Sequence, residues 1–295
     1  MQKRYSEIGQ LLDGAGRQQL RMWTVDITGG RRPRLQHSHP QFELSTVLRG
    51  GGIYEIGGRQ MPMEEGDVFV FAGNEPHWIE AVAQEGLEFL NLQFEPQYLW
   101  SHGADGTEGF PMHFWFHHSD RFPSRIPAAQ AQPLRQLLDR IRQELTAQKV
   151  KYPLVIRGHL QELLVLLIRE HGYLEETQTG SWSQVEGIQR VIRYLDTHIA
   201  HPVQLKELAA IANLSPNYFS ALFHQECRVT LWEYIAARRV DMAAGLLLQM
   251  DQSQTMLDIA LTCGFHNTAN FNKAFRKYMG MTPSAYRRQA KEIPF

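Results

Sequence analysis

Residues 208–223 read LAAIANLSPNYFSALF and residues 259–275 read IALTCGFHNTANFNKAF, so one apolar pattern occurs twice in the last third of the chain. The offset between the copies is 51 residues before a central turn and 52 residues after it. The matching pairs are Leu208/Ile259, Ala209/Ala260, Ala212/Cys263, Leu214/Phe265, Phe219/Phe271, Leu222/Ala274 and Phe223/Phe275. Each copy has the spacing of a short helix, a turn and a second helix. The sequence therefore predicts two helix-turn-helix units in tandem.

Capping residues mark the predicted helix ends. Ser215-Pro216 offers an N-cap hydroxyl before a proline at the first helical position, and Asn267 can cap the matching helix of the second unit. Gly264 and Gly280 suit the turns of that unit. Between the units, Thr230 and Glu233 have capping-box spacing and open a connecting helix of about 18 residues. Its length of roughly 27 Å is near the ~34 Å that separates successive major-groove faces, so both second helices could read one side of DNA.

These residues resemble the DNA-binding domain of the AraC/XylS family of bacterial transcription regulators, over about residues 185–290. The resemblance rests on LAAIANLSPNYF (208–219), on the connecting helix, and on a dense set of later matches. The connecting-helix matches are Tyr234, Arg239, Ala243, Leu246 and Leu247, and the later matches are DIA (258–260), CGF (263–265), NF (270–271), FRK (275–277), GMTP (280–283) and Tyr286-Arg287. The resemblance implies a protein that binds double-stranded DNA and acts with RNA polymerase.

The chain departs from the family pattern at two places in this domain. Arg228 stands where the family usually has glycine after the first recognition helix, which would alter the turn or add a phosphate contact. Ala269 stands where the family often has a polar residue, which would remove a contact to DNA.

Base-reading residues must be polar or small groups on the outward face of each second helix. The predicted DNA-binding residues are Asn217, Ser220, Ala221, His224, Thr268, Asn272, Lys273, Arg276 and Lys277. Among them, Asn217 suits an adenine edge, Ala221 a thymine methyl group, and Lys273 a guanine or a phosphate. Arg276 and Lys277 suit the phosphate backbone. The alternative is that these residues form an ordinary solvated helix face.

Charge and composition favour an ordinary cytoplasmic protein. Residues 184–295 carry a net charge of +3 and residues 1–183 a net charge of −4, so the DNA-binding part is only weakly basic and paired half-sites would help it bind. No stretch has the roughly 18 uninterrupted apolar residues of a membrane span. Cys227 and Cys263, the only cysteines, are expected to be reduced structural thiols rather than redox sensors.

The N-terminal part has short apolar runs separated by glycine-rich turns. Strands are predicted at 42–48, 52–56, 68–71 and 87–94, which indicates an all-β barrel or sandwich. His37, His39, Glu43 and Gly50, followed by Gly66-Asp67 and His77, resemble the two motifs of the cupin jelly roll. The second motif is incomplete, with Ala72 and Asn74 where proline and glycine are usual.

Strand alternation would place His37 and His39 on one face, so with Glu43 and His77 they could hold a divalent metal in the barrel mouth. The competing interpretation requires no cofactor. In it the same four residues, with Tyr54 and Trp78, line an effector pocket, and the resemblance implies a sugar or oligosaccharide as effector. Core packing is the simpler role for each aromatic residue taken alone.

A third piece is predicted to be helical. Its apolar stripes are Leu134, Leu137, Leu138, Ile141 and Leu145, then Leu160, Leu163, Leu164, Leu167 and Ile168. Such stripes suit either a helical cap or pairing of two chains, and we expect a homodimer because paired half-sites double the DNA contact. Residues 176–181 look like a linker.

The sequence thus predicts an α+β multidomain chain with three parts. These are a cupin-like β jelly roll that binds effector (1–127), a helical linker and dimerisation region (128–183), and an all-α domain with two helix-turn-helix motifs (184–295). The predicted function is a ligand-responsive activator of a sugar or small-molecule utilisation operon, and not an enzyme. The alternatives are a metal-dependent cupin dioxygenase or isomerase with a DNA-binding tail, and a ligand-independent regulator whose cupin is a scaffold.

Overall fold

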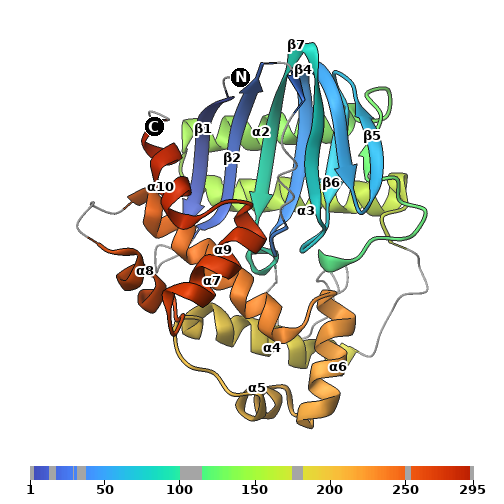
Figure 1. Ribbon diagram of the computed structural model, residues 1–295. Coiled ribbons are helices and arrows are strands. Elements are labelled where there is room, and N and C mark those ends of the chain that lie inside the picture. The colour runs from blue at the N-terminus through green and yellow to red at the C-terminus, as the bar shows by residue number, and fades with distance from the viewer. Residues whose placement is uncertain are drawn as a thin grey trace.

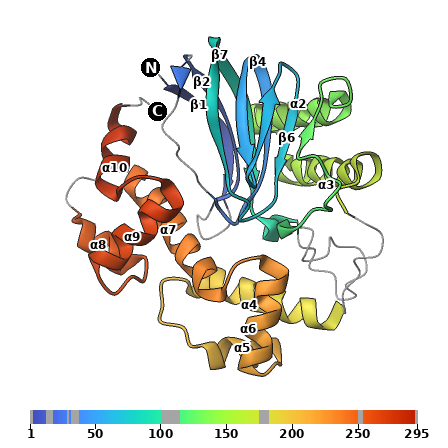
Figure 2. The ribbon, with the colours of Figure 1, turned by 45° about the vertical axis from the view of Figure 1, so that its right-hand side comes forward.

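The computed structural model describes residues 3–12, 18–28, 30–31, 38–99, 115–174, 182–249 and 254–292. An antiparallel sheet with two helices on one side is followed by a group of shorter helices (Figure 1). Both views place these later helices around one end and one edge of the sheet, away from the two helices that cover it (Figure 2). Among the described helices, none is long and apolar enough to cross a lipid bilayer.

The sheet has the strand order β1-β2-β7-β4-β6-β8, with β3 beside β7 and β5 beside β4. All these pairings are antiparallel. The strands are β1 (Lys3–Leu12), β2 (Gln18–Ile27), β3 (Gly30–Arg31), β4 (Phe42–Ile56), β5 (Arg59–Met63), β6 (Val68–Phe71), β7 (His77–Phe94) and β8 (Arg125–Ile126). The predicted all-β, cupin-like N-terminal domain is therefore confirmed.

Two of the predicted strands are halves of one long strand. Residues 42–48 and 52–56 both belong to β4, and residues 87–94 are the second half of β7. Register shifts between Val47 and Arg49, and between Gly50 and Gly52, interrupt the pairing of β4 with β7. A Cβ atom at Gly52 would lie 2.4 Å from the carbonyl oxygen of Ala81, so glycine is required where the two strands come close.

Both faces of the sheet are buried. One face, with Phe42 and Leu44, shares a core with helices α2 (Gln132–Ala147) and α3 (Tyr152–His171). The other face has its own cluster, which includes Trp23, Tyr54 and Phe71. The predicted apolar stripes of α2 and α3 lie in the first core, except for the partly buried Ile168. Because these stripes are covered within one chain, they do not by themselves require a second copy.

The two helix-turn-helix units are confirmed. The helices are α4 (Trp182–His198), α5 (Leu205–Ala212), α6 (Pro216–Cys227), α7 (Leu231–Gln249), α8 (Met256–Thr262), α9 (Thr268–Met279) and α10 (Pro283–Glu292). Helices α5 and α6 form the first unit, α8 and α9 form the second, and α7 connects them. Phe219 packs against Phe223 in the first helix-turn-helix unit. Phe271 packs against Phe275 at the matching positions of the second unit.

The predicted N-cap residues are found at all three helix starts, but only two of them make the capping hydrogen bond. Thr230 and Glu233 exchange backbone-to-side-chain hydrogen bonds of 3.1 and 3.2 Å, and Asn267 accepts a bond of 2.8 Å from the amide of Asn270. Ser215 occupies the N-cap position of α6, but its hydroxyl makes no capping hydrogen bond. The fixed φ of Pro216 suits the start of this helix without one.

Both cysteines are buried in helical cores. Cys227 and Cys263 are free thiols with no exposed surface. Burial raises the pKa of the Cys263 thiol to about 12 and raises the pKa of the Cys227 thiol well above its ordinary value, so neither forms a thiolate readily. This environment supports a structural role for both.

Asp67 ties the turn before β6 to the start of the helical layer. Its carboxylate is buried and accepts hydrogen bonds from Arg125 Nε at 2.7 Å, from the amide of Ala128 at 3.0 Å and from the amide of Glu64 at 3.0 Å. A buried carboxylate persists only when it is satisfied in this way.

Replacing Asp67 with alanine should destabilise the N-terminal domain strongly. The Asp67→Ala change removes the acceptor of three hydrogen bonds and takes from Arg125 its buried partner. We expect the free energy of unfolding to fall by about 3 kcal/mol. Urea unfolding followed by circular dichroism measures it. The control is Asp139→Ala, which breaks an ion pair with Arg142 that is half exposed and should cost under about 0.5 kcal/mol. Equal losses in the two variants would contradict this account.

Candidate functional site

Three of the four predicted pocket residues converge in the structure. Glu43 is the second residue of β4, His77 is the first residue of β7, and His39 lies just before β4. His39 Nε2 and Glu43 Oε2 are 2.9 Å apart, and the two histidine rings meet edge to face with centroids 5.4 Å apart. Nitrogen or carboxylate atoms of all three residues lie within 4.8 Å of one another. We call His39, Glu43 and His77 the sensor triad.

The predicted reason for this convergence was wrong. His39 is not in a strand, so strand alternation does not place it. It precedes a bend at residues 40 and 41 that leads into β4, and from there its side chain reaches Glu43. His37, the fourth predicted member, lies outside the described residues.

His77 is held in one orientation. Its Nδ1 lies 2.9 Å from the carbonyl oxygen of Glu75, and its ring stacks on Phe71 with centroids 4.0 Å apart. A carbonyl only accepts, so Nδ1 carries a proton, and in the neutral ring the lone pair is on Nε2. A metal-binding histidine is usually fixed in the same manner, with the second nitrogen as ligand.

The charge state of His39 depends on Glu43. Burial lowers the pKa of His39, but the hydrogen bond and negative charge of Glu43, together with the charge of Asp241 and the carbonyl of Gln41, outweigh burial and leave this pKa above its ordinary value. Two imidazoles and one carboxylate are a donor set that fits a zinc-like divalent ion. Such an ion would have to displace the proton from His39.

The two aromatic residues predicted to line the pocket, Tyr54 and Trp78, lie on opposite sides of the sheet. Tyr54 lies on the triad side, where its ring packs against Phe69 and Phe71 and its hydroxyl donates to Ser45 Oγ at 3.3 Å. Trp78 follows His77 directly, so alternation points it to the opposite side of the strand. There its indole nitrogen donates to Glu80 at 3.0 Å.

Sequence reasoning missed three further polar residues on the triad face. Gln93 of β7 lies between Arg21 of β2 and Glu43 of β4, its partners in the sheet. Asn91 of β7 lies opposite Trp23 of β2. Arg21 Nε and Asn91 Oδ1 are buried and have no hydrogen-bond partner among the described residues. Alternation with the apolar Met22, Leu90 and Leu92 was the signal that could have identified this polar face.

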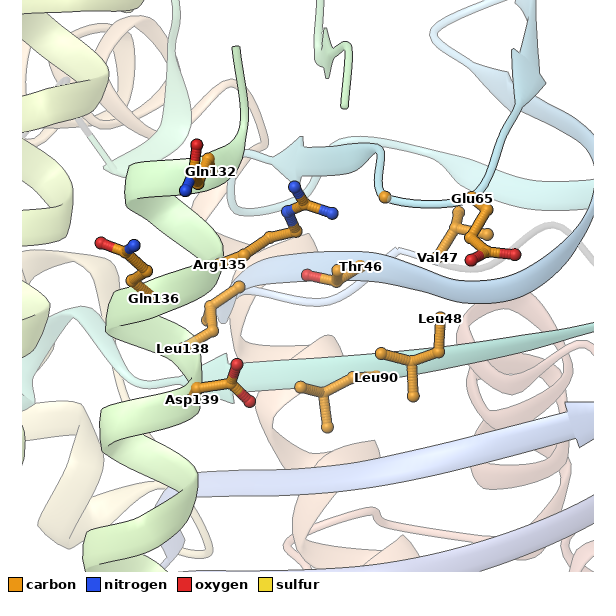
Figure 3. Close-up of a pocket in the computed structure, with 11 residues that line it drawn as sticks. Thr46, Val47, Leu48, Glu65, Leu90, Gln132, Arg135, Gln136, Leu138 and Asp139 are labelled. Carbon is orange, nitrogen blue, oxygen red and sulfur yellow. The ribbon is translucent and has the colours of Figure 1, made fainter. Parts of the chain in front are cut away.

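A cavity of about 360 Å³ lies elsewhere, between the sheet and α2 (Figure 3). Leu48 and Leu90 line it from the strands, and Arg135 and Asp139 project toward it from the helix. None of the predicted effector residues contributes to its lining.

The predicted DNA-binding residues lie on the outward faces of α6 and α9. Asn217, Ala221 and His224 are exposed on α6, whereas Ser220 is half-buried. On α9 the exposed residues are Asn272, Lys273, Arg276 and Lys277, and Thr268 is half-buried. The exposed Ala269 offers no hydrogen-bonding group there.

The lysines of α9 differ in their surroundings. Lys277 Nζ lies 2.9 Å from Glu233 Oε1 in α7, and this hydrogen bond, with those from Thr230, lowers the pKa of Glu233 to about 2. Lys273 makes no ion pair with any residue that the structure describes. Lys273 is therefore the better placed of the two to contact DNA.

A polar network joins the sensor sheet to α7. Arg238 Nη1 bonds to Glu95, which follows β7, and Arg238 Nη2 bonds to Asp196 of α4 at 3.1 Å. Gln41, two residues after His39, donates to Glu95 at 2.8 Å and to Asp241 of α7 at 3.1 Å. Burial lowers the pKa of Arg238, but the charge of Glu95 and its neighbours raises it well above its ordinary value overall. The sensor triad thus lies next to the contact between the two parts of the chain.

Comparisons with known proteins cover both parts. Residues 208–289 match a helix-turn-helix domain family, and residues 24–164 match the AraC-like ligand-binding domain family. The transcriptional activator RhaR of Escherichia coli is 25% identical over 261 residues, covering 85% of this chain and 86% of RhaR. The probable transcriptional regulator LumQ of Photobacterium leiognathi is 30% identical over 105 residues, covering 35% of this chain and 42% of LumQ.

The solved structure of ToxT from Vibrio cholerae with a bound unsaturated fatty acid has the same two-part fold. It superposes with a TM-score of 0.60 at 10% sequence identity, over all of this chain and 97% of ToxT. The curated relatives are transcription regulators, which confirms the predicted class and sets aside the cupin enzyme. The chain belongs to the AraC family of ligand-responsive transcription regulators, with a cupin-like sensor domain ahead of its DNA-binding domain.

Proposed function

We propose that this regulator activates a sugar or small-molecule utilisation operon when a sugar or oligosaccharide binds the triad face of its sensor domain. The observation that carries the proposal is the pair of buried polar atoms on that face, Arg21 Nε and Asn91 Oδ1, which lack partners among the described residues. Buried polar groups need hydrogen bonds, and a polyhydroxylated ligand supplies both donors and acceptors. Trp23 and Tyr54 add aromatic surface for the apolar side of a sugar ring.

The proposed effector contacts include the predicted residues His37, His39, Glu43, His77 and Tyr54, with Trp78 in a supporting position. No cofactor is required in this mechanism. A divalent metal on the sensor triad is the second candidate, favoured by the donor set and by the fixed orientation of His77. A metal bound there would orient polar ligand oxygens and compete with the proton on His39.

Double-stranded DNA is the proposed partner of the α6 and α9 faces. Asn217, Ala221 and His224 would read one major-groove segment, and Asn272 and Lys273 the next, with Arg276 on phosphate. Ser220, Thr268 and Lys277 would make peripheral contacts. We further propose that the protein works as a cytoplasmic homodimer and recruits RNA polymerase, because the domain is too weakly basic to bind DNA tightly as a single copy.

A saccharide that binds the triad face should stabilise the native protein. Thermal unfolding of the full chain against a panel of mono- and oligosaccharides should give a higher midpoint with one of them, and a chelator should leave that shift in place. At 100 times its Kd, such a ligand adds about 2.7 kcal/mol of stability. His77→Gln should abolish the shift. Arg135→Ala, in the cavity beneath α2, is the matched control and should keep it.

The same experiment separates the alternatives. A midpoint that falls with chelator and rises with added Zn²⁺ would establish the metal site. A panel in which no saccharide shifts the midpoint would refute sugar binding and favour the scaffold interpretation.

Lys273→Ala should weaken DNA binding about tenfold, because it removes an exposed cation that is free to reach DNA. The measurement is fluorescence anisotropy with a duplex selected from random DNA by the full chain, at several salt concentrations. If Lys273 binds phosphate, the slope of log K against log salt should decrease by about one; if it reads guanine, discrimination at one base pair should fall by about 1–3 kcal/mol. Lys149→Ala, at an exposed turn of the sensor, is the control. Unchanged affinity in Lys273→Ala would remove this residue from the interface.

A further inference from the structure

Among the described residues, six other than glycine have a positive φ, and two of these six lie at the contact between the two domains. Asn74 has a φ of +66° in the turn between β6 and β7, and Arg228 has a φ of +57° at the end of α6. Asparagine tolerates this left-handed region better than most residues, whereas arginine is strained in it. In the second helix-turn-helix unit the same position after the recognition helix is Gly280, with a φ of +69°. The chain thus has the unstrained residue in one copy of its repeat and arginine in the other.

Both side chains reach across to the other domain. Asn74 Nδ2 donates to the carbonyl oxygen of Cys227 at 3.2 Å. Arg228 Nε donates to Nδ1 of His117 at 2.7 Å, and His117 Nε2 lies 2.9 Å from the carbonyl oxygen of Glu226. The last carbonyls of a helix have no partner within it, so the sensor domain caps the C-terminal end of the first recognition helix. We call Asn74, His117 and Arg228 the clasp.

The hydrogen bonds fix the chemistry of His117. Nδ1 accepts from a guanidinium, so Nε2 carries the proton and donates to Glu226. The neutral ring therefore bridges the arginine side chain and the helix end. The turn after α6 is kept despite the missing glycine, and the Arg228 side chain points to the sensor domain.

The clasp is connected to the sensor triad by short links. The amide of Asn74 donates to the carbonyl oxygen of His39 at 2.6 Å. Glu75 contacts His77 through its carbonyl oxygen, and its side chain lies 3.1 Å from His118 Nε2, next to His117. A ligand that shifts His39 or His77 therefore acts directly on the segments that carry Asn74 and His117.

We propose that Arg228 is a positioning residue, which with Asn74 and His117 fixes the first helix-turn-helix unit on the sensor domain and does not contact DNA phosphate. Backbone strain at Arg228 persists because the interdomain bonds hold it in place. The consequence for DNA rests on the proposed function, since the clasp would set how α6 is presented to a binding site.

Glycine substitutions test the contact without harming the local fold. Arg228→Gly and Asn74→Gly each relieve a left-handed residue, so any loosening must come from the lost side chain. Hydrogen exchange in the full chain should show it across the interface. Arg228→Gly should speed exchange several-fold at residues 73–77 and 115–119, and Asn74→Gly should do so at residues 222–230. Gln148→Gly, at an exposed left-handed position of the α2–α3 turn, should leave both segments unchanged. Unaltered exchange on the opposite domain in both clasp variants would overturn the proposal.

Binding to a duplex selected from random DNA by the wild-type chain tests the consequence. Arg228→Gly and His117→Ala should weaken binding by the same factor, at least threefold, and the double variant should be no weaker than either single variant. A phosphate contact would instead give a loss in Arg228→Gly alone, with a salt slope reduced by about one, and would refute the positioning role. If the wild-type chain selects no DNA, the proposed function fails, while the exchange measurement still decides the clasp.

Discussion

The guanidinium of Arg238 is enclosed between Glu95 of the sensor domain and Asp196 of α4, and the placement of the DNA-binding helices depends on this contact. The side chains of Arg238 and Glu95 are 16% and 8% exposed, so water solvates them little and each charge is stabilised mainly by the other. Removing one partner of such a buried pair typically costs about 3–5 kcal/mol, although the intact pair adds little net stability over apolar packing. The pair therefore specifies an arrangement more than it strengthens the fold. It fixes α7, and α7 carries one helix-turn-helix unit at each end.

The sensor triad lies in the same two chain segments that hold the DNA-binding domain. His39 belongs to the same short segment as Gln41, which joins the Arg238 network through Glu95 and Asp241. His77 belongs to the segment that carries Asn74. A ligand does not need to move the whole sheet, because the residues that would bind it are neighbours of the residues that hold the second domain. Control of DNA binding then requires only that the ligand prefer one position of these two segments.

The sequence predicted most where several local cues agreed. The helix-turn-helix units combine a repeated apolar skeleton with caps such as Asn267 and Thr230, and the structure has helices at both copies. The strands were harder to predict from the sequence. The β1–β2 hairpin mixes charged and apolar residues and gave no clear alternation, and the bend in β4 made one strand look like two. Convergence of His39 with Glu43 and His77 was anticipated from motif resemblance, but the wrong local geometry was assigned to it. The contacts Gln41–Asp241, Asn74–Cys227 and Arg228–His117 pair residues 200, 153 and 111 positions apart, which no local pattern reveals.

The two interdomain contacts differ in strength, and this difference suits a switch. The clasp consists of three hydrogen bonds, one of them made by the exposed Arg228, and each contributes about 0.5–1.5 kcal/mol net. A ligand that binds only one arrangement supplies about 2.7 kcal/mol toward it at 100 times its Kd, which is comparable with the roughly 1.5–4.5 kcal/mol of the three bonds together. The same ligand is too weak to break the buried Arg238 pair. Effector binding should therefore adjust the clasp first and leave α7 attached, so that the first helix-turn-helix unit changes its presentation while the second remains anchored through α7. A wholly apolar interface of similar size would not have one weak and one strong contact, because its parts would separate together.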